Sequence, residues 1–246
     1  MKTLISIICS VVLLISLLSA CGTDIAKPTE TAESGSTAPT EKESVNAPTE
    51  TAAKVDIGTV DDYVSEAETR TIIYNGEVIG TAHIPEIKLD SEDARITNEE
   101  IRDKILKELE NNDTGFNSVD YEAGLRNTVL SVFIEANVDG GNVYGLCYDL
   151  DVVSGESLKS DELCAKIGVG YSDVLNTVRN NLTVYYDEKY SSLPDEMNKT
   201  YREKTISNDN LLAAKLYVNK EGKLMAMTDI YATVGGGHWI AKIEAE

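Results

Sequence analysis

Histidine and cysteine, the side chains most often used for metal binding and nucleophilic catalysis, are scarce in this sequence. The 246 residues contain two histidines, His83 and His238, and four cysteines. No Cys and His spacing resembles a zinc site, no Gly-x-Ser-x-Gly segment marks a catalytic serine, and the aspartates lack calcium-loop spacing. We therefore expect both histidines to be structural or exposed. Motifs give no reason to assign a catalytic residue, a metal or a cofactor.

Basic side chains are also few. Lys and Arg number 22 against 42 Asp and Glu, which gives a formal net charge of -20. Such a surface repels the phosphates of nucleic acids, so nucleic-acid binding is excluded as a function class. The charge is compatible with a cationic protein partner, although an acidic surface often serves solubility alone.

A long hydrophobic run occurs close to the N-terminus. It begins at Leu4 after Lys2 and closes with Leu18-Ser19-Ala20-Cys21. A run of about fifteen apolar residues is short for a transmembrane helix and typical of an export signal. Its last four residues resemble the lipobox of bacterial lipoproteins, in which the cysteine receives a diacylglyceryl group and the chain is cut before it. An ordinary secretory signal is the alternative.

The lipobox predicts that residues 1–20 are a signal peptide and that Cys21 is the lipid attachment site. Two or three acyl chains suffice to hold a protein on a bilayer. We therefore expect the protein on the outer face of the cytoplasmic membrane. The long segment that follows favours a bacterium of the Gram-positive type.

Residues 21–54 have the composition of a tether. Thr, Glu, Pro, Ala and Ser dominate, and Pro-Thr-Glu occurs three times, beginning at Pro28, Pro39 and Pro48. Such a segment buries too little apolar surface to offset its ordering entropy, so we expect it to be disordered. Its mean reach as a flexible chain is roughly 30 Å, enough to lift a domain off the membrane.

Residues 55–246 read as one extracellular domain. Asn75-Gly76 between two β-rich runs predicts a tight hairpin. Residues 130–138 and 144–152 alternate apolar and polar side chains around a glycine turn, which predicts a second hairpin with one buried face. Two subdomains that divide near residues 120–127 remain an open alternative.

Helices are predicted between these strands. Thr97 and Glu100 match a capping box, and Ile101, Ile105 and Leu109 form a stripe at helical spacing. A second helix is expected over 172–186 and a weaker one over 197–204. Strands are expected again over 214–218 and 223–234. The order of elements predicts an α+β fold, with a mainly antiparallel sheet and two or three packed helices.

Two pairs of residues are candidates for chemistry. Asp149 and Asp151 share one strand face, as paired carboxylates in acid–base or metal sites do, although pairs arise easily by chance among 42 acids. Cys147 and Cys164 are the thiols that remain after lipidation. A disulfide between them is permitted outside the membrane, where it would contribute roughly 3 kcal/mol, whereas unsuitable geometry would leave two free thiols.

Three sets of segments carry a resemblance: residues 148–158 with 161–163, residues 84–87 with 98–101, and residues 216–231. Together they resemble a family of extracellular domains of unknown function. This family occurs in the outer part of the lysozyme-sensing anti-sigma-V factor and beside the catalytic domain of PdaC-type peptidoglycan deacetylases. In the family the second hairpin turn often ends with a histidine. Here Gly140-Gly141 is followed by Asn142, so a ligand role for this turn does not carry over.

The resemblance and the lipobox together imply a lipid-anchored binding or sensing module without catalytic activity. Its partner would be an extracellular protein, lysozyme-like in one version, or a wall glycan. One alternative is an envelope enzyme that modifies peptidoglycan through Asp149 and Asp151. The other is a structural or assembly lipoprotein.

Overall fold

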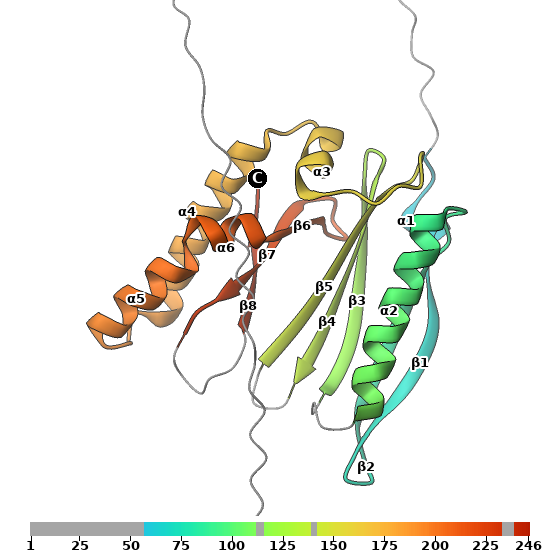
Figure 1. Ribbon diagram of the computed structural model, residues 1–246, viewed down its shortest axis with the longest axis horizontal. Coiled ribbons are helices and arrows are strands. Elements are labelled where there is room, and N and C mark those ends of the chain that lie inside the picture. Colours follow the sequence, from blue (N-terminus) through green and yellow to red (C-terminus); the bar gives the residue numbers. More distant parts are fainter. Residues whose placement is uncertain (1–56, 112–115, 139–141, 233–238) are drawn as a thin grey trace, which may run out of the picture. The chain divides into compact units, whose positions relative to one another are not determined.

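Two β-sheets and six helices are formed by the described residues, which in this computed structural model are 57–111, 116–138, 142–232 and 239–246 (Figure 1). The predicted α+β class with mainly antiparallel strands is confirmed, but the helices exceed the expected two or three. The additional ones are short: α1 (Val60–Tyr63), α3 (Ser160–Ile167) and α6 (Asn208–Ala213). The predicted signal peptide, Cys21 and the tether lie outside the described residues.

The first sheet has the strand order β1-β2-β3-β4-β5. It opens with the predicted hairpin, in which β1 (Val64–Tyr74) pairs antiparallel with β2 (Glu77–Ile87). Asn75 and Gly76 both have positive φ angles, 51° and 83°. A tight hairpin turn that matches the twist of its strands needs this backbone conformation, which Asn and Gly adopt most readily.

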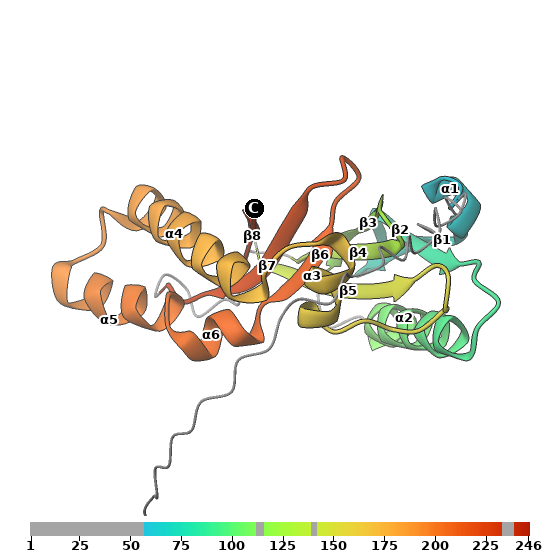
Figure 2. The ribbon, with the colours of Figure 1, turned by 90° about the horizontal axis from the view of Figure 1, so that it is seen from above.

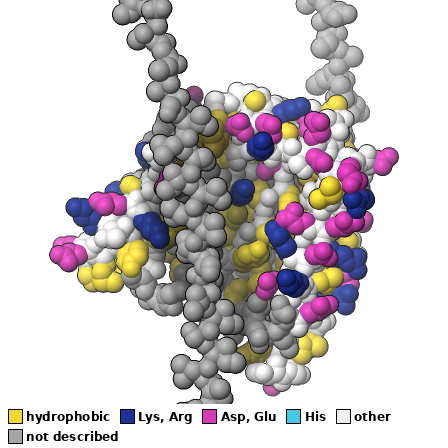
Figure 3. All heavy atoms as spheres, viewed as in Figure 1, with side chains coloured by type: hydrophobic (Ala, Val, Ile, Leu, Met, Phe, Trp, Pro, Cys, Tyr) yellow, Lys and Arg dark blue, Asp and Glu magenta, His cyan; other side chains and the backbone are white. Residues whose placement is uncertain are grey.

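Helix α2 (Glu92–Asn111) connects β2 to β3 (Phe116–Arg126), and β2 and β3 form the parallel pair of this sheet. The helix begins earlier than the Thr97 capping box predicted. The Ser91 hydroxyl accepts a hydrogen bond from the Ala94 amide at 3.1 Å. Thr97 lies within the helix instead of at its start, and its side chain is buried. The outer surface of α2 carries interspersed acids and bases (Figure 3), including Arg95 between Glu92 and Glu99.

The second predicted hairpin is also present, as β4 (Val129–Val138) and β5 (Asn142–Asp151). Residues 120–127, the alternative boundary between two subdomains, lie within β3 and its turn to β4. The expectation of one buried face is wrong for β4, because both of its faces are covered. Leu130, Val132 and Ile134 face the α2 side, while Ser131 and Phe133 are buried on the opposite side.

The rest of the chain builds a second core. Helices α3, α4 (Tyr171–Tyr190), α5 (Asp195–Thr205) and α6 precede an antiparallel sheet of β6 (Lys215–Val218), β7 (Leu224–Ile230) and β8 (Trp239–Glu244). Val174, Val178 and Leu182 of α4 pack against one face of this sheet, as their helical spacing predicts (Figure 2).

The other face of the second sheet meets the first sheet. The rings of Phe133 and Tyr217 stack with centroids 4.7 Å apart, and Lys242 pairs with Glu135 at 2.5 Å. At Gly124 the two backbones come so close that an added Cβ would lie 2.1 Å from the Asn219 carbonyl oxygen. A side chain at this position would force the sheets apart.

Candidate binding site

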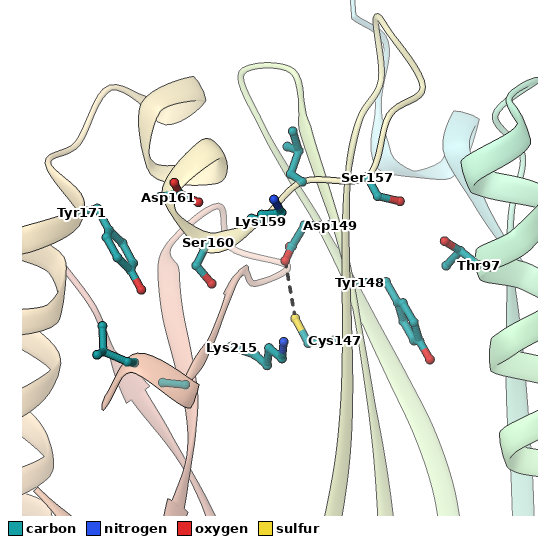
Figure 4. A pocket seen from close by; sticks show the side chains of 13 residues that line it. Thr97, Cys147, Tyr148, Asp149, Ser157, Lys159, Ser160, Asp161, Tyr171 and Lys215 are labelled. Carbon is teal, nitrogen blue, oxygen red and sulfur yellow. Dashed lines mark hydrogen bonds between the residues drawn. The ribbon is translucent and has the colours of Figure 1, made fainter. Parts of the chain in front are cut away.

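A pocket of about 360 Å³ opens beside β5, between the two sheets (Figure 4). It is bounded by β5, by the segment from Ser157 to Asp161, by the start of α4 and by the junction of α6 with β6. Its lining combines charged, hydroxyl, aromatic and apolar side chains: Thr97, Cys147, Tyr148, Asp149, Ser157, Leu158, Lys159, Ser160, Asp161, Tyr171, Leu212, Ala214 and Lys215.

One wall is formed by residues 156–158, a short return segment that folds back along β5. The Asp151 amide donates to the Glu156 carbonyl at 2.9 Å, and the Leu158 amide donates to the Asp149 carbonyl at 2.8 Å. The turn between them depends on Gly155, whose φ of 76° disfavours other residues. The Ser91 hydroxyl at the start of α2 holds the turn by donating to the Gly155 carbonyl at 2.8 Å.

Asp149 connects the pocket to the interface of the sheets. Its Oδ1 accepts a 2.5 Å hydrogen bond from the Ser131 hydroxyl. The oxygen of that hydroxyl in turn accepts a 2.8 Å hydrogen bond from the Val218 amide of β6. Burial raises the pKa of Asp149 to about 7, although the hydrogen bonds from Ser131 and Cys147 and the charge of Lys215 act to lower it. This carboxyl group therefore exchanges its proton near neutral pH.

Cys147 lies next to Asp149 as a free, protonated thiol. Its Sγ is 3.8 Å from Asp149 Oδ2 and 3.5 Å from the Leu216 carbonyl oxygen. Burial, and secondarily the charge of Asp149, raise the pKa of this thiol well above its usual value. A thiol held in the neutral form is a poor nucleophile.

The disulfide that the sequence permits is absent, since Cys147 and Cys164 are both free thiols. Cys164 is fully buried on α3 in the second core. Burial raises the pKa of its thiol to about 11.

The predicted carboxylate pair is not brought together in the pocket. Asp151 is 1% exposed, and its side chain accepts hydrogen bonds from the Thr128 hydroxyl and from the Val153 and Ser154 amides. It also pairs with Lys166 at 2.5 Å. Burial alone would raise the pKa of Asp151, but these partners lower it to about 2. Asp151 therefore stabilises the end of β5, and Asp149 alone reaches the pocket.

The remaining lining residues are arranged for polar recognition. Figure 4 shows Tyr148 and Thr97 on the α2 side of β5, and Cys147, Asp149 and Lys215 on the other side. The Tyr148 hydroxyl donates to Glu100 at 3.3 Å, and burial raises the pKa of this phenol. Two ammonium groups, two carboxyl groups and several hydroxyls offer both donors and acceptors to a ligand.

Most of this wall carries no local sequence signal. The segment Ser157–Asp161 and Lys215 had no site assignment, because their proximity to Asp149 depends on how the second sheet packs. One usable signal was Ser154-Gly155, which marks a turn directly after a strand and hence a chain that can fold back on it.

The other candidates lie elsewhere. His83 is partly exposed on the β1–β2 hairpin, where its Nδ1 is 2.7 Å from a Glu66 carboxylate oxygen. His238, like Cys21, falls outside the described residues. Among the residues that the structure describes, no group of three or more His, Cys, Asp or Glu side chains is placed to hold a metal ion.

No model of a protein family matches the chain, and no curated protein does so either. Within the described ranges, no helix has the length and apolar character needed to cross a membrane.

Proposed function

We propose that this protein is a lipid-anchored binding module of the bacterial cell envelope, and that its ligand occupies the pocket beside β5. The observation that carries the proposal is the pocket itself. It is open, its volume is about 360 Å³, and hydroxyl, charged and aromatic groups converge on it. Such a combination is typical of sites that recognise polar ligands.

The location follows from the N-terminal sequence. A lipid on Cys21 and a tether over 21–54 would hold the domain outside the membrane, within reach of wall material and secreted proteins. The resemblance to domains that occur in a lysozyme sensor and beside wall-modifying enzymes supports the same setting. Extracellular proteins and wall glycans are therefore the two ligand classes to be tested.

Binding is favoured over catalysis by the surroundings of Asp149. Its carboxyl group already accepts a hydrogen bond from the Ser131 hydroxyl and contacts the Cys147 thiol. The nearby Asp151 accepts hydrogen bonds from the turn after β5. The neutral Cys147 thiol is not activated for attack.

A sedimentation assay with purified wall fragments, together with a pull-down of lysozyme, tests the proposal at low and at moderate salt. The chain from Gly22 to Glu246 is compared with its Leu212→Trp variant, which places a larger side chain at an exposed position of the pocket lining. Val184→Trp is the matched control, because Val184 is also exposed on a helix but does not line the pocket.

We expect binding that persists at moderate salt, that Leu212→Trp weakens at least tenfold, and that Val184→Trp leaves unchanged. Moderate salt is needed because a protein of charge -20 holds cationic proteins nonspecifically when screening is weak. Binding that both variants retain equally would place the ligand elsewhere and refute the pocket.

A peptidoglycan-modifying enzyme is the second candidate, favoured by the pKa of about 7 at Asp149. A carboxyl group that titrates near neutrality within a pocket can serve as a general acid or base. Asp149→Asn would then abolish release of wall fragments without reducing sedimentation with the wall. Unchanged wall release in this variant would dispose of the enzyme hypothesis.

A further inference from the structure

The outer edge of β5 runs along the pocket and presents backbone hydrogen-bonding groups to it. Neighbouring residues of a strand direct their backbone groups to opposite sides. The Val152 amide donates toward the β4 side, to the Thr128 carbonyl, whereas the Asp149 carbonyl accepts Leu158 on the outer side. The backbone groups of Cys147 and Asp149 therefore face outward.

Part of this edge is already occupied by the chain itself. The return segment pairs antiparallel with β5 through a bridge between Leu150 and Ser157. It then leaves the edge at Leu158 and enters α3 at Ser160. In the part of the chain that the structure describes, no backbone group bonds the outward amides of Asp149 and Cys147.

The pocket begins where the return segment leaves. Cys147, Tyr148 and Asp149 all line it, so the unpaired stretch of edge is accessible from the pocket. An extended polypeptide there would continue the pairing that residues 156–158 start. Glycans lack the alternating amide and carbonyl groups that a strand edge pairs with, so the edge favours a polypeptide.

We propose that the pocket binds an extended polypeptide segment, which adds as a strand to the β5 edge at Cys147–Asp149. This inference rests on the proposed binding function and names its ligand class. Side chains of the added strand would alternate between the two faces of the sheet. One set would meet Asp149 and Lys215 and is polar. The other would meet Tyr148 and Thr97, which lie on the α2 side of β5 (Figure 4), and we expect this set to be aromatic or aliphatic.

Hydrogen exchange of the Gly22–Glu246 chain tests whether the edge is open. The probe is a peptide selected from a phage-displayed library of random 12-residue sequences. In the protein alone, the outward amides of Cys147 and Asp149 should exchange faster than the Tyr148 and Leu150 amides, which face β4. The peptide should slow exchange at Cys147 and Asp149. Amides of Cys147 and Asp149 that are already protected without peptide would overturn the inference.

An N-methyl scan of the selected peptide tests the mode of binding. Each peptide amide that faces β5 should lose affinity by about tenfold on methylation, while the amides between them lose little, so the losses recur at every second residue. A matched protein pair removes one edge amide: Cys147→Pro lacks the amide, whereas Cys147→Ala keeps it and loses only the thiol. Proline is tolerated at an outward-facing edge position.

The outcomes separate this inference from the proposed function. Period-two losses together with weak binding to Cys147→Pro support strand addition. A scan without periodicity, or a library without enriched sequences, overturns it. Binding of an N-acetylglucosamine tetramer that Leu212→Trp blocks, without peptide binding, would sustain the binding function and overturn the polypeptide. Absence of pocket-dependent binding to peptides, sugars, wall and lysozyme would refute both.

Discussion

Asp149→Asn should change how the stability of the protein depends on pH. The pKa of Asp149 is about 7 in the folded protein against an ordinary value of 3.8. The folded state therefore keeps this proton at pH values where the unfolded chain has lost it. The contribution of Asp149 to the free energy of unfolding is therefore fully present below about pH 4. It falls as the pH rises toward 7 and stays at its lower value above pH 7. Asparagine does not titrate, so the variant lacks this loss.

The size of the effect follows from the two pKa values. At about 1.4 kcal/mol for each pH unit between them, the ionised carboxylate costs at most about 4 kcal/mol of folding free energy. About 2.5 kcal/mol of this falls between pH 5 and pH 8. Water that enters the pocket screens the charge, so we expect the wild type to lose about 1.5 kcal/mol relative to Asp149→Asn over this range.

Urea unfolding followed by the fluorescence of Trp239, the single tryptophan, measures the difference at pH 5, 6, 7 and 8. Asp151→Asn, two residues along the same strand, is the control. The pKa of Asp151 is about 2, so it stays ionised over this range and its replacement should cost about the same, roughly 2 kcal/mol, at every pH. Parallel pH profiles for the wild type and Asp149→Asn would refute the reasoning.

Three further predictions concern the packing, the thiols and the anchor. Gly124→Ala should lower the free energy of unfolding by about 1–3 kcal/mol in urea titrations, because its Cβ meets the Asn219 carbonyl backbone; an unchanged midpoint would contradict the close approach of the sheets. Protein purified under air should contain two free thiols by non-reducing mass spectrometry, and the buried Cys164 should react with Ellman's reagent only after unfolding. Cys21→Ser should move the protein from the membrane fraction to the medium; a variant that stays on the membrane would argue against the lipid anchor.

Local signals predicted the parts of the fold that depend on neighbouring residues. Asn75-Gly76 specifies its turn through backbone conformation alone, and alternation defines the β4–β5 hairpin whatever packs on it. The α4 stripe likewise needs only helical spacing. The start of α2 was missed because Thr97 matches a cap pattern, while Ser91 caps the helix.

The site could be predicted only in part, because it is assembled from distant segments. Asp149 was a candidate, but its pairing with Asp151 was inferred from strand parity. The alternation of side chains along a strand gives no information about the turn after β5, whose amides donate hydrogen bonds to Asp151. Lys215 reaches the pocket through the packing of the second sheet on the first, and such long-range packing has no local pattern.

The polar side chains on the second-sheet face of β4 and β5 bear on the order of folding. A chain made from its N-terminus completes the first sheet at Asp151, before the residues of β6 exist. The face that awaits the second sheet carries Ser131, Glu135 and Asp149 beside Phe133. These groups can be hydrated meanwhile, so the half-made protein exposes a surface that resists aggregation. When the second sheet finally packs on the first, it buries Asp149. The free-energy cost of this last step then depends on whether Asp149 is protonated.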